Sequence, residues 1–465
     1  MAILQHTPTQ KLPLIGSKVP ARLQSGSWIQ AFVLFQIACQ LALLVSDSGL
    51  VRAVVRFAVF GASLFLLVFL RGQGRVHPAG RPARWVLAIV GLSILHPMTN
   101  SLLSGVTHAA LYVAILAPLF WVARLRVDIS ELQRVVFILW AFNTLSATIG
   151  VLQVYFPGKF EPYLTPVIAT MDPGYIEGLY ITTAGGYRVF RPMGLTNIPG
   201  GAAAGGFYAV LFGIGFLLIS RRPWLRAAAV SSMTLGMMCL YLSQVRVALV
   251  MLIVCLLTIC GLMARRGAAA RLAIVSAVLT MAIGASLIWA ISIGGQDVTD
   301  RLATLVQDDP RQVYYVNRGH FLEETIAELL PLYPLGAGLG RWGMVNAYLG
   351  DDSDPERAAI WVEIQWTGWL VDGGVPLILA YVAALFLALW TAWRIALSRA
   401  TDHRDNLWLW GALLFAYNVG ALAVTFSYPL FIGQGGLEFW LLNAVVFSAA
   451  RGVYPLLKSP RGPQR

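Results

Sequence analysis

The sequence predicts an all-α fold in which a bundle of helices crosses a membrane many times. Of its 465 residues, 58% are hydrophobic and only 12% are charged, and its mean hydropathy is +0.70. A soluble protein of this size carries roughly a quarter charged residues to cover its surface. Most of the surface must therefore face membrane lipid, and the chain, residues 1–465, is predicted to form a single integral membrane domain.

Twelve apolar runs predict the helices, because each approaches the roughly 20 residues that cross a hydrocarbon core of about 30 Å. The first run follows a polar, proline-containing segment and leads directly into the second, which is typical of a retained anchor and not of a cleaved signal peptide. The predicted spans are 28–46, 50–70, 85–105, 107–123, 132–156, 199–220, 226–243, 246–264, 271–293, 361–393, 406–427 and 433–450.

The basic residues predict the orientation of this bundle. Lys and Arg number 34 against 22 Asp and Glu, and most of them form short clusters between alternate spans. Under the positive-inside rule, this pattern places both termini in the cytoplasm. Because the clusters interrupt apolar runs and cover no continuous solvated face, nucleic-acid binding is not predicted. The cysteines all lie in apolar runs, so neither a disulfide framework nor a cysteine metal site is expected.

Two segments on the predicted outer side are too long to be simple turns, residues 157–198 and 294–360. The second, between spans nine and ten, has a helical pattern around Gly319 to Leu330 and many apolar and aromatic residues. We expect this loop to be partly helical and to form a small cap over the outer face of the bundle.

Arginines on the outer side are the first candidates for chemistry. A guanidinium group offers a planar, permanently charged set of donors that suits phosphate oxygens, and the pyrophosphate of a lipid-linked sugar lies at this depth of a membrane. Arg52 and Arg56 lie one helical turn apart, where snorkelling to the interface is the favoured interpretation and a phosphate clamp is the alternative. Arg246, at the turn between spans seven and eight, is open to both interpretations.

Four stretches carry a resemblance to a known family. They are YRVFRPMGLTNIPGG at 187–201, SQVRVALVML at 243–252, NRGHFLEETIAELLPLYPLGAGLGRWG at 317–343 and EIQWTGWLVDGGVPLIL at 363–379. The glycine run in the third stretch is predicted to let the backbone approach another group closely. In this order and with this topology, the stretches resemble the O-antigen ligase and O-antigen polymerase (Wzy-type) superfamily. The resemblance covers residues 187–395, about 45% of the chain.

The resemblance implies a GT-C-like glycosyltransferase of the bacterial inner membrane, with its large loops in the periplasm. Such an enzyme moves a glycan from undecaprenyl diphosphate to an acceptor, without a nucleotide sugar and without a metal ion or other cofactor. By the match, Arg246 takes the Ser-x-x-Arg position, Arg318 opens the loop helix, and Arg191 or Arg188 precedes the Gly/Asn/Pro turn. These arginines are expected to bind the diphosphate as it leaves.

One departure from the family concerns the base that deprotonates the acceptor. The ligases have a His-Asn pair about eleven residues before the glycine that corresponds to Gly374, and this chain has Glu363 and Ile364 there. Glu363 is therefore the candidate base, or else a structural carboxylate paired with Arg357 or Arg318. His320 in the outer loop is the rival base.

Two acids inside predicted spans, Asp372 and Glu438, are functional candidates because ionisable groups are costly in lipid. Both are expected near the outer end of the bundle, where water can reach them and where proton relays of transporters are an alternative role. Numerous aromatic residues in the outer loops are expected to stack on sugar rings.

Three functions remain open at this stage. The leading hypothesis is a polysaccharide polymerase that joins lipid-linked repeat units, together with a possible chain-length regulator. The second is an O-antigen ligase that transfers finished glycan to lipid A core or to protein, against which the missing histidine argues. The third, from a different class, is a secondary transporter or a flippase for lipid-linked oligosaccharides, although the sequence shows no internal repeat of the kind common in transporters.

Overall fold

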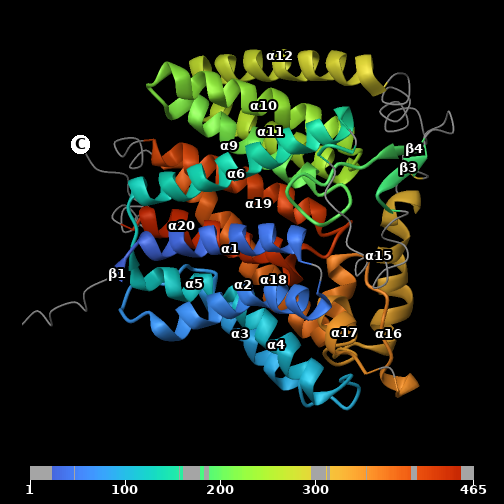
Figure 1. Ribbon diagram of the computed structural model, residues 1–465. Coiled ribbons are helices and arrows are strands. Elements are labelled where there is room, and N and C mark those ends of the chain that lie inside the picture. The colour runs from blue at the N-terminus through green and yellow to red at the C-terminus, as the bar shows by residue number, and fades with distance from the viewer. Residues whose placement is uncertain are drawn as a thin grey trace, which may run out of the picture.

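The computed structural model describes residues 24–46, 48–156, 158–160, 178–182, 188–294, 311, 315–351, 353–398 and 406–451. In this part of the chain the fold is almost entirely helical, and the long helices lie side by side in one bundle (Figure 1). Ten helical segments are long and apolar enough to cross a membrane. The prediction of an all-α, multi-pass membrane protein is confirmed.

Nine of the ten segments are single helices, and the tenth is Leu102–Arg124, made of α4 (Leu102–Leu116), α5 (Pro118–Trp121) and a final 3₁₀ turn. The single helices are α1 (Ser27–Val45), α2 (Gly49–Phe69), α6 (Ile129–Tyr155), α9 (Ala202–Ile219), α10 (Pro223–Ser243), α11 (Arg246–Arg265), α12 (Ala269–Gly294), α18 (Gln365–Leu397) and α19 (Leu407–Val424). Two shorter helices, α3 (Gly80–Ser93) and α20 (Gln434–Ala449), complete the bundle.

The predicted spans 85–105 and 107–123 have the wrong boundaries. α3 ends at Ser93, residues 94–101 form turns, and α4 begins at Leu102. Pro97 disfavours helical backbone at the residue before it, which ends the helix early. The side chain of Ser101 then accepts a hydrogen bond from the backbone N–H of Ser104, and this cap starts the next helix.

The centre of the bundle is built around α9, which is buried along most of its length and packs most closely on α10. At their crossing, a Cβ on Gly206 would lie 2.6 Å from the carbonyl oxygen of Gly236, and one on Gly236 would lie 2.7 Å from that of Gly206. Small residues let two membrane helices approach this closely. α1, α2 and α12 are the least buried of the long helices and form the periphery.

One end of the bundle carries the short elements of the predicted loops, and we call it the capped end (Figure 1). These elements are α15 (His320–Glu324), α16 (Leu330–Leu332), α17 (Gly343–Leu349) and the antiparallel strands β3 (Tyr180–Thr182) and β4 (Arg188–Phe190). The helical stretch expected around Gly319 to Leu330 is confirmed. Residues 161–177, 183–187 and 295–310 of the predicted loops lie outside the described residues.

The opposite end of the bundle holds the short parallel pair β1 (Gln24–Ser25) and β2 (Leu125–Arg126) (Figure 1). Arginines there donate to backbone carbonyl oxygens at helix ends. Arg124 bonds to Leu70 O at 2.8 Å, and Arg451 bonds to Ala123 O at 2.7 Å. Cations are stabilised beside such carbonyls by the helix dipole.

α18 is interrupted near the capped end, where Gly373 and Gly374 leave the helical conformation. The glycine run between α16 and α17 fills this break: Ala337 N–H donates to Val371 O at 2.7 Å, and Val375 N–H donates to Pro334 O at 3.0 Å. The glycine run was predicted to approach another group closely. That group is the protein's own backbone.

We expect Gly374→Ala to destabilise the protein more than Gly343→Ala. Both glycines have positive φ angles, +66° and +68°, so each substitution costs about 1–2 kcal/mol of backbone strain. A Cβ on Gly374 would also collide with the carbonyl oxygen of Pro334, whereas nothing lies within 4 Å of one on Gly343. Thermal unfolding of the purified protein in detergent measures the difference. Equal losses for the two variants would show that the glycine run does not pack in the break of α18.

Candidate functional site

Arg318 and Glu363 form an ion pair at the capped end. Arg318 Nη2 lies 2.9 Å from Glu363 Oε2, and Arg318 Nη1 donates to the carbonyl oxygen of Ser427 at 2.7 Å. The side chains remain 43% and 19% exposed, so a ligand can reach both groups. Of the two partners considered for Glu363, Arg318 is the one that binds it, because Arg357 pairs with Asp354 at 3.3 Å.

The backbone at Arg318 is unusual, with a φ angle of +83°. This left-handed conformation favours glycine, and in another residue it is a source of strain that concentrates at functional sites. Arg318 lies in the π-helical turn Tyr315–Gly319, directly before α15. The turn directs the guanidinium toward the residues between α19 and α20. Burial raises the pKa of Tyr428 in that segment, and the positive charge of Arg318 acts in the opposite direction.

His320 lies next to this pair in sequence and has a defined tautomer. Its Nδ1 lies 2.8 Å from the carbonyl oxygen of Tyr315, and its ring packs on Phe321 with the centroids 4.0 Å apart. Because a carbonyl can only accept, Nδ1 carries the hydrogen, and Nε2 of the neutral ring keeps a lone pair. His320 is half-buried, and in this tautomer Nε2 can accept a proton.

Arg191 lies against the turn that precedes α9. Its Nη1 donates to Gly178 O at 3.3 Å, and burial lowers the pKa of its guanidinium. A Cβ on Gly200 would lie 3.1 Å from Arg191 Nη2 and 2.8 Å from Val245 Cγ2, so Arg191 and the start of α11 lie against the same glycine. Arg246 is the first residue of α11. The backbone of Arg188 pairs with Thr182 between β3 and β4, while its side chain lies outside what the structure describes.

The register of α11 on α19 brings Arg246 to the level of Arg318. The two helices run antiparallel, with Cys255 Sγ 3.2 Å from Ala416 O and Met251 packed at Gly420. Continuing this register by five residues places Arg246 level with residue 425, directly after α19 and two residues before Ser427, which accepts from Arg318. Arg191, Arg246 and Arg318 therefore all lie at the capped end. We call these three residues the arginine cluster.

Arg52 and Arg56 meet on Asn197, in the same turn that follows Arg191. With the amide oriented to satisfy its neighbours, Asn197 Oδ1 accepts from Arg52 Nη2 at 2.8 Å and from Arg56 Nη2 at 3.0 Å. Arg52 is 3% exposed and also donates to Leu43 O, at the end of α1, at 2.8 Å. The favoured interpretation of Arg52 as a snorkelling residue is therefore wrong, since it stabilises protein backbone and not the lipid interface. Arg56 stays half-buried beside the ring of Tyr348.

The turn is shaped by Gln153, a residue that was not predicted from the sequence. Gln153 of α6 accepts from the backbone N–H groups of Met193 and Gly194 and donates to Gly194 O, at 2.8 to 3.1 Å. The only sign of this role in the sequence is that Gln153 is a polar residue within an apolar run. Its hydrogen-bond partners lie about forty residues away, so the sequence does not reveal them.

Asp372 does not face water, contrary to the expectation. It is 0% exposed, and its carboxylate accepts from Tyr112 OH at 2.7 Å and from Trp342 Nε1 at 2.8 Å, with His108 Nε2 at 3.2 Å. Trp342 follows the glycine run, and Asp372 directly precedes the break in α18. The acid thus ties the loop to α4 and α18, and it is a structural group.

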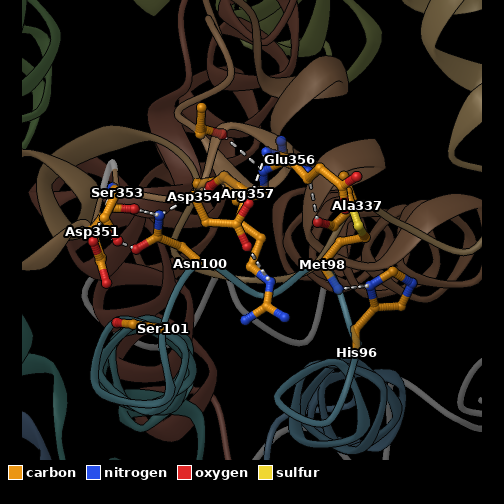
Figure 2. Close-up of polar contacts among 12 residues, drawn as sticks. His96, Met98, Asn100, Ser101, Ala337, Asp351, Ser353, Asp354, Glu356 and Arg357 are labelled. Atoms are coloured by element: carbon orange, nitrogen blue, oxygen red, sulfur yellow. Dashed lines mark hydrogen bonds and ion pairs between the residues drawn. The ribbon is translucent and has the colours of Figure 1, made fainter.

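A second polar contact joins the loop to the turn between α3 and α4. Figure 2 shows Asn100 between two loop residues: its Nδ2 donates to Asp351 O at 2.8 Å and to Arg357 O at 3.0 Å, and its Oδ1 accepts from Asp351 N–H at 2.8 Å. Together with the Asp372 contacts, these bonds hold residues 334–351 and 353–360 on the bundle. The loop therefore offers a fixed surface to a ligand at the capped end.

The comparisons with known proteins leave the family open. No family model matches this chain. No curated protein matches it significantly. Within the described residues, no group of three or more His, Cys, Asp or Glu side chains is placed to hold a metal ion.

Proposed function

We propose that this protein is a polysaccharide polymerase of the Wzy type, which transfers a glycan from undecaprenyl diphosphate to a lipid-linked acceptor. The observation that carries the proposal is the location of Arg191, Arg246 and Arg318 at the capped end, with Arg318 paired to Glu363. Guanidinium groups offer planar, permanently charged donors that suit the oxygens of a diphosphate.

The proposed topology has twelve spans. The two shorter helices, α3 with 14 residues and α20 with 16, lie within the bundle and are counted with the ten longer segments. The basic residues at the end that carries β1 and β2 support a cytoplasmic location for that end, and the capped end is then periplasmic. We propose a GT-C-like bundle in a bacterial inner membrane, and this orientation supports contact of the arginine cluster with a lipid-linked diphosphate on the periplasmic side.

The proposed reaction joins the acceptor hydroxyl oxygen to the anomeric carbon of the donor glycan. The bond between that carbon and the diphosphate oxygen breaks, and its electron pair stays on the departing lipid diphosphate. The arginine cluster stabilises this charge, which is the main requirement of the step. The hydroxyl proton passes to Glu363 or to Nε2 of His320. When Arg318 turns to the diphosphate, its contact with Glu363 is released, and the carboxylate is free to accept the proton.

The test is complementation of a strain that lacks this protein, with polysaccharide chain length read on a gel. We expect Arg246→Ala and Glu363→Gln to abolish long chains or to shorten them strongly, while single repeat units are still attached to their final acceptor. Arg134→Ala is the matched control, because Arg134 is an exposed arginine that pairs with Glu131 at the opposite end of the bundle. All variants are compared at equal amounts in the membrane. Normal chain length in both site variants would overturn the proposal and favour a transporter.

A further inference from the structure

A second polar group of side chains lies inside the bundle, apart from the arginine cluster. Its centre is the carboxylate of Glu438 in α20. Oε2 accepts from Tyr208 OH of α9 at 2.8 Å, and Oε1 accepts from Gln36 Nε2 of α1 at 3.1 Å and from Gln434 Nε2 at 3.4 Å. We call these four residues the Glu438 cluster.

Two observations point to a ligand at this cluster. Gln36 is 2% exposed, yet its carbonyl oxygen Oε1 has no hydrogen-bond partner among the described residues. A buried polar atom left without a partner is costly, and in native proteins it calls for an explanation. Glu438 itself is only half-buried, although its neighbours Leu437 and Phe439 are 0% and 1% exposed. Part of the Glu438 side chain therefore remains accessible, while the residues on either side of it are packed in the core.

The hydrogen-bond directions define what the ligand must supply. Tyr208 has one hydroxyl hydrogen and gives it to Glu438, so in the Tyr208–Tyr417 pair at 3.1 Å the donor is Tyr417. The carboxylate has no salt bridge within the part of the chain that the structure describes. The cluster thus presents oxygen atoms that accept, on Gln36 and Glu438, to a ligand that donates. One carboxylate and one amide make a poor metal site, whereas hydroxyl groups are donors that fit both oxygens.

The Glu438 cluster is connected to the arginine cluster by the turn before α9. Gln40, one helical turn from Gln36 on α1, donates to Leu195 O at 3.2 Å. The same turn begins at Arg191 and ends at Gly200, against which Arg191 packs. The helix that carries Gln36 is therefore bonded directly to the turn that carries Arg191.

We propose that the Glu438 cluster binds hydroxyl groups of the carbohydrate acceptor, with Glu438 and Gln36 accepting their hydrogens. This inference rests on the function proposed above, because it assigns the second substrate of that reaction to a second place in the bundle. It concerns binding and positioning of the acceptor, and it adds no chemical step.

The experiment uses the full chain purified in lipid nanodiscs and an octyl glycoside of the host's repeat unit as the probe. This probe carries hydroxyl groups but no diphosphate, so it can act as acceptor and never as donor. We expect Glu438→Gln and Gln36→Leu each to weaken direct binding of the probe about 10- to 100-fold, the range for loss of one or two hydrogen bonds, one of them to a charged group. Binding of undecaprenyl diphosphate should stay unchanged, which also shows that the variants are folded.

Glu131→Gln is the matched control, because Gln30 of α1 donates to Glu131 in the same way at the opposite end of the bundle. Unchanged probe affinity in both cluster variants, or no binding of the probe to the wild-type protein, would overturn the inference. Transfer assays separate this result from failure of the proposed function. If the wild type binds the probe through Glu438 yet transfers no glycan, a carbohydrate-binding site at the Glu438 cluster stands, and the polymerase proposal fails together with the role of that site in the reaction.

Discussion

Removing the guanidinium of Arg318 should lower glycan transfer about 100- to 1,000-fold, the loss that follows when one group that stabilises developing negative charge is deleted. The best deletion is Arg318→Gly, because the φ angle of +83° suits glycine and the variant adds no backbone strain. Initial rates with saturating lipid-linked donor and acceptor measure the effect. Arg318→Lys should recover only part of the rate, since lysine cannot bind two phosphate oxygens with a planar fork.

The matched control for this variant is Arg357→Ala. Arg357 also pairs with a carboxylate in the same loop, at 3.3 Å from Asp354, and lies outside the arginine cluster. Its rate should stay within about twofold of the wild type, as expected when an exposed ion pair is lost. Equal rates for Arg318→Gly and the wild type would remove Arg318 from the reaction and leave it with structural contacts to Glu363 and the Ser427 carbonyl.

Replacing Asp372 should destabilise the protein more than any substitution at the arginine cluster. Asp372→Ala leaves the buried donors of Tyr112 and Trp342 without an acceptor, and each such group costs about 1–3 kcal/mol. We expect a total loss of about 3–5 kcal/mol, in line with the removal of one member of a buried charged network. Asp372→Asn should lose less, because one amide oxygen still accepts. Thermal unfolding in detergent measures both variants.

The loss of stability also distinguishes a structural acid, Asp372, from an acid of the candidate site, Glu363. Glu363→Gln alters an accessible ion pair and should change stability by at most about 1 kcal/mol. If Asp372→Ala unfolds at the same temperature as the wild type but loses all transfer, Asp372 takes part in the reaction and its interpretation as a structural group is wrong.

Helices were predictable wherever an apolar run was long enough, because hydropathy alone decides which segments can cross lipid. The boundaries failed between α3 and α4, where Pro97 and the cap at Ser101 decide the local structure within a continuous apolar pattern. The break in α18 was also missed. It depends on Gly373 and Gly374 having a partner, the glycine run at 334–340, which comes from a distant part of the chain.

The candidate site was also predictable only in part: its charged residues could be named, but most of their neutral partners could not. Arginine is recognisable in sequence by its charge, so Arg191, Arg246 and Arg318 could be named, and the structure brings them to one end of the bundle. The alternative of an ion pair between Glu363 and Arg318 was also foreseen. Glu438 was also named, but its partner Gln36, like Gln153 and Asn197, gave too little signal, because a neutral amide is recognisable only from partners that are remote in sequence.

The central claim is that the arginine cluster supports transfer of glycan from a lipid diphosphate. The most direct measurement reconstitutes the purified wild-type protein in liposomes with undecaprenyl diphosphate-linked repeat units and counts both products. We expect one undecaprenyl diphosphate released for each new glycosidic bond, with a ladder of longer chains. Movement of unextended repeat units across the bilayer, with no lipid diphosphate released, would contradict the account and identify a transporter.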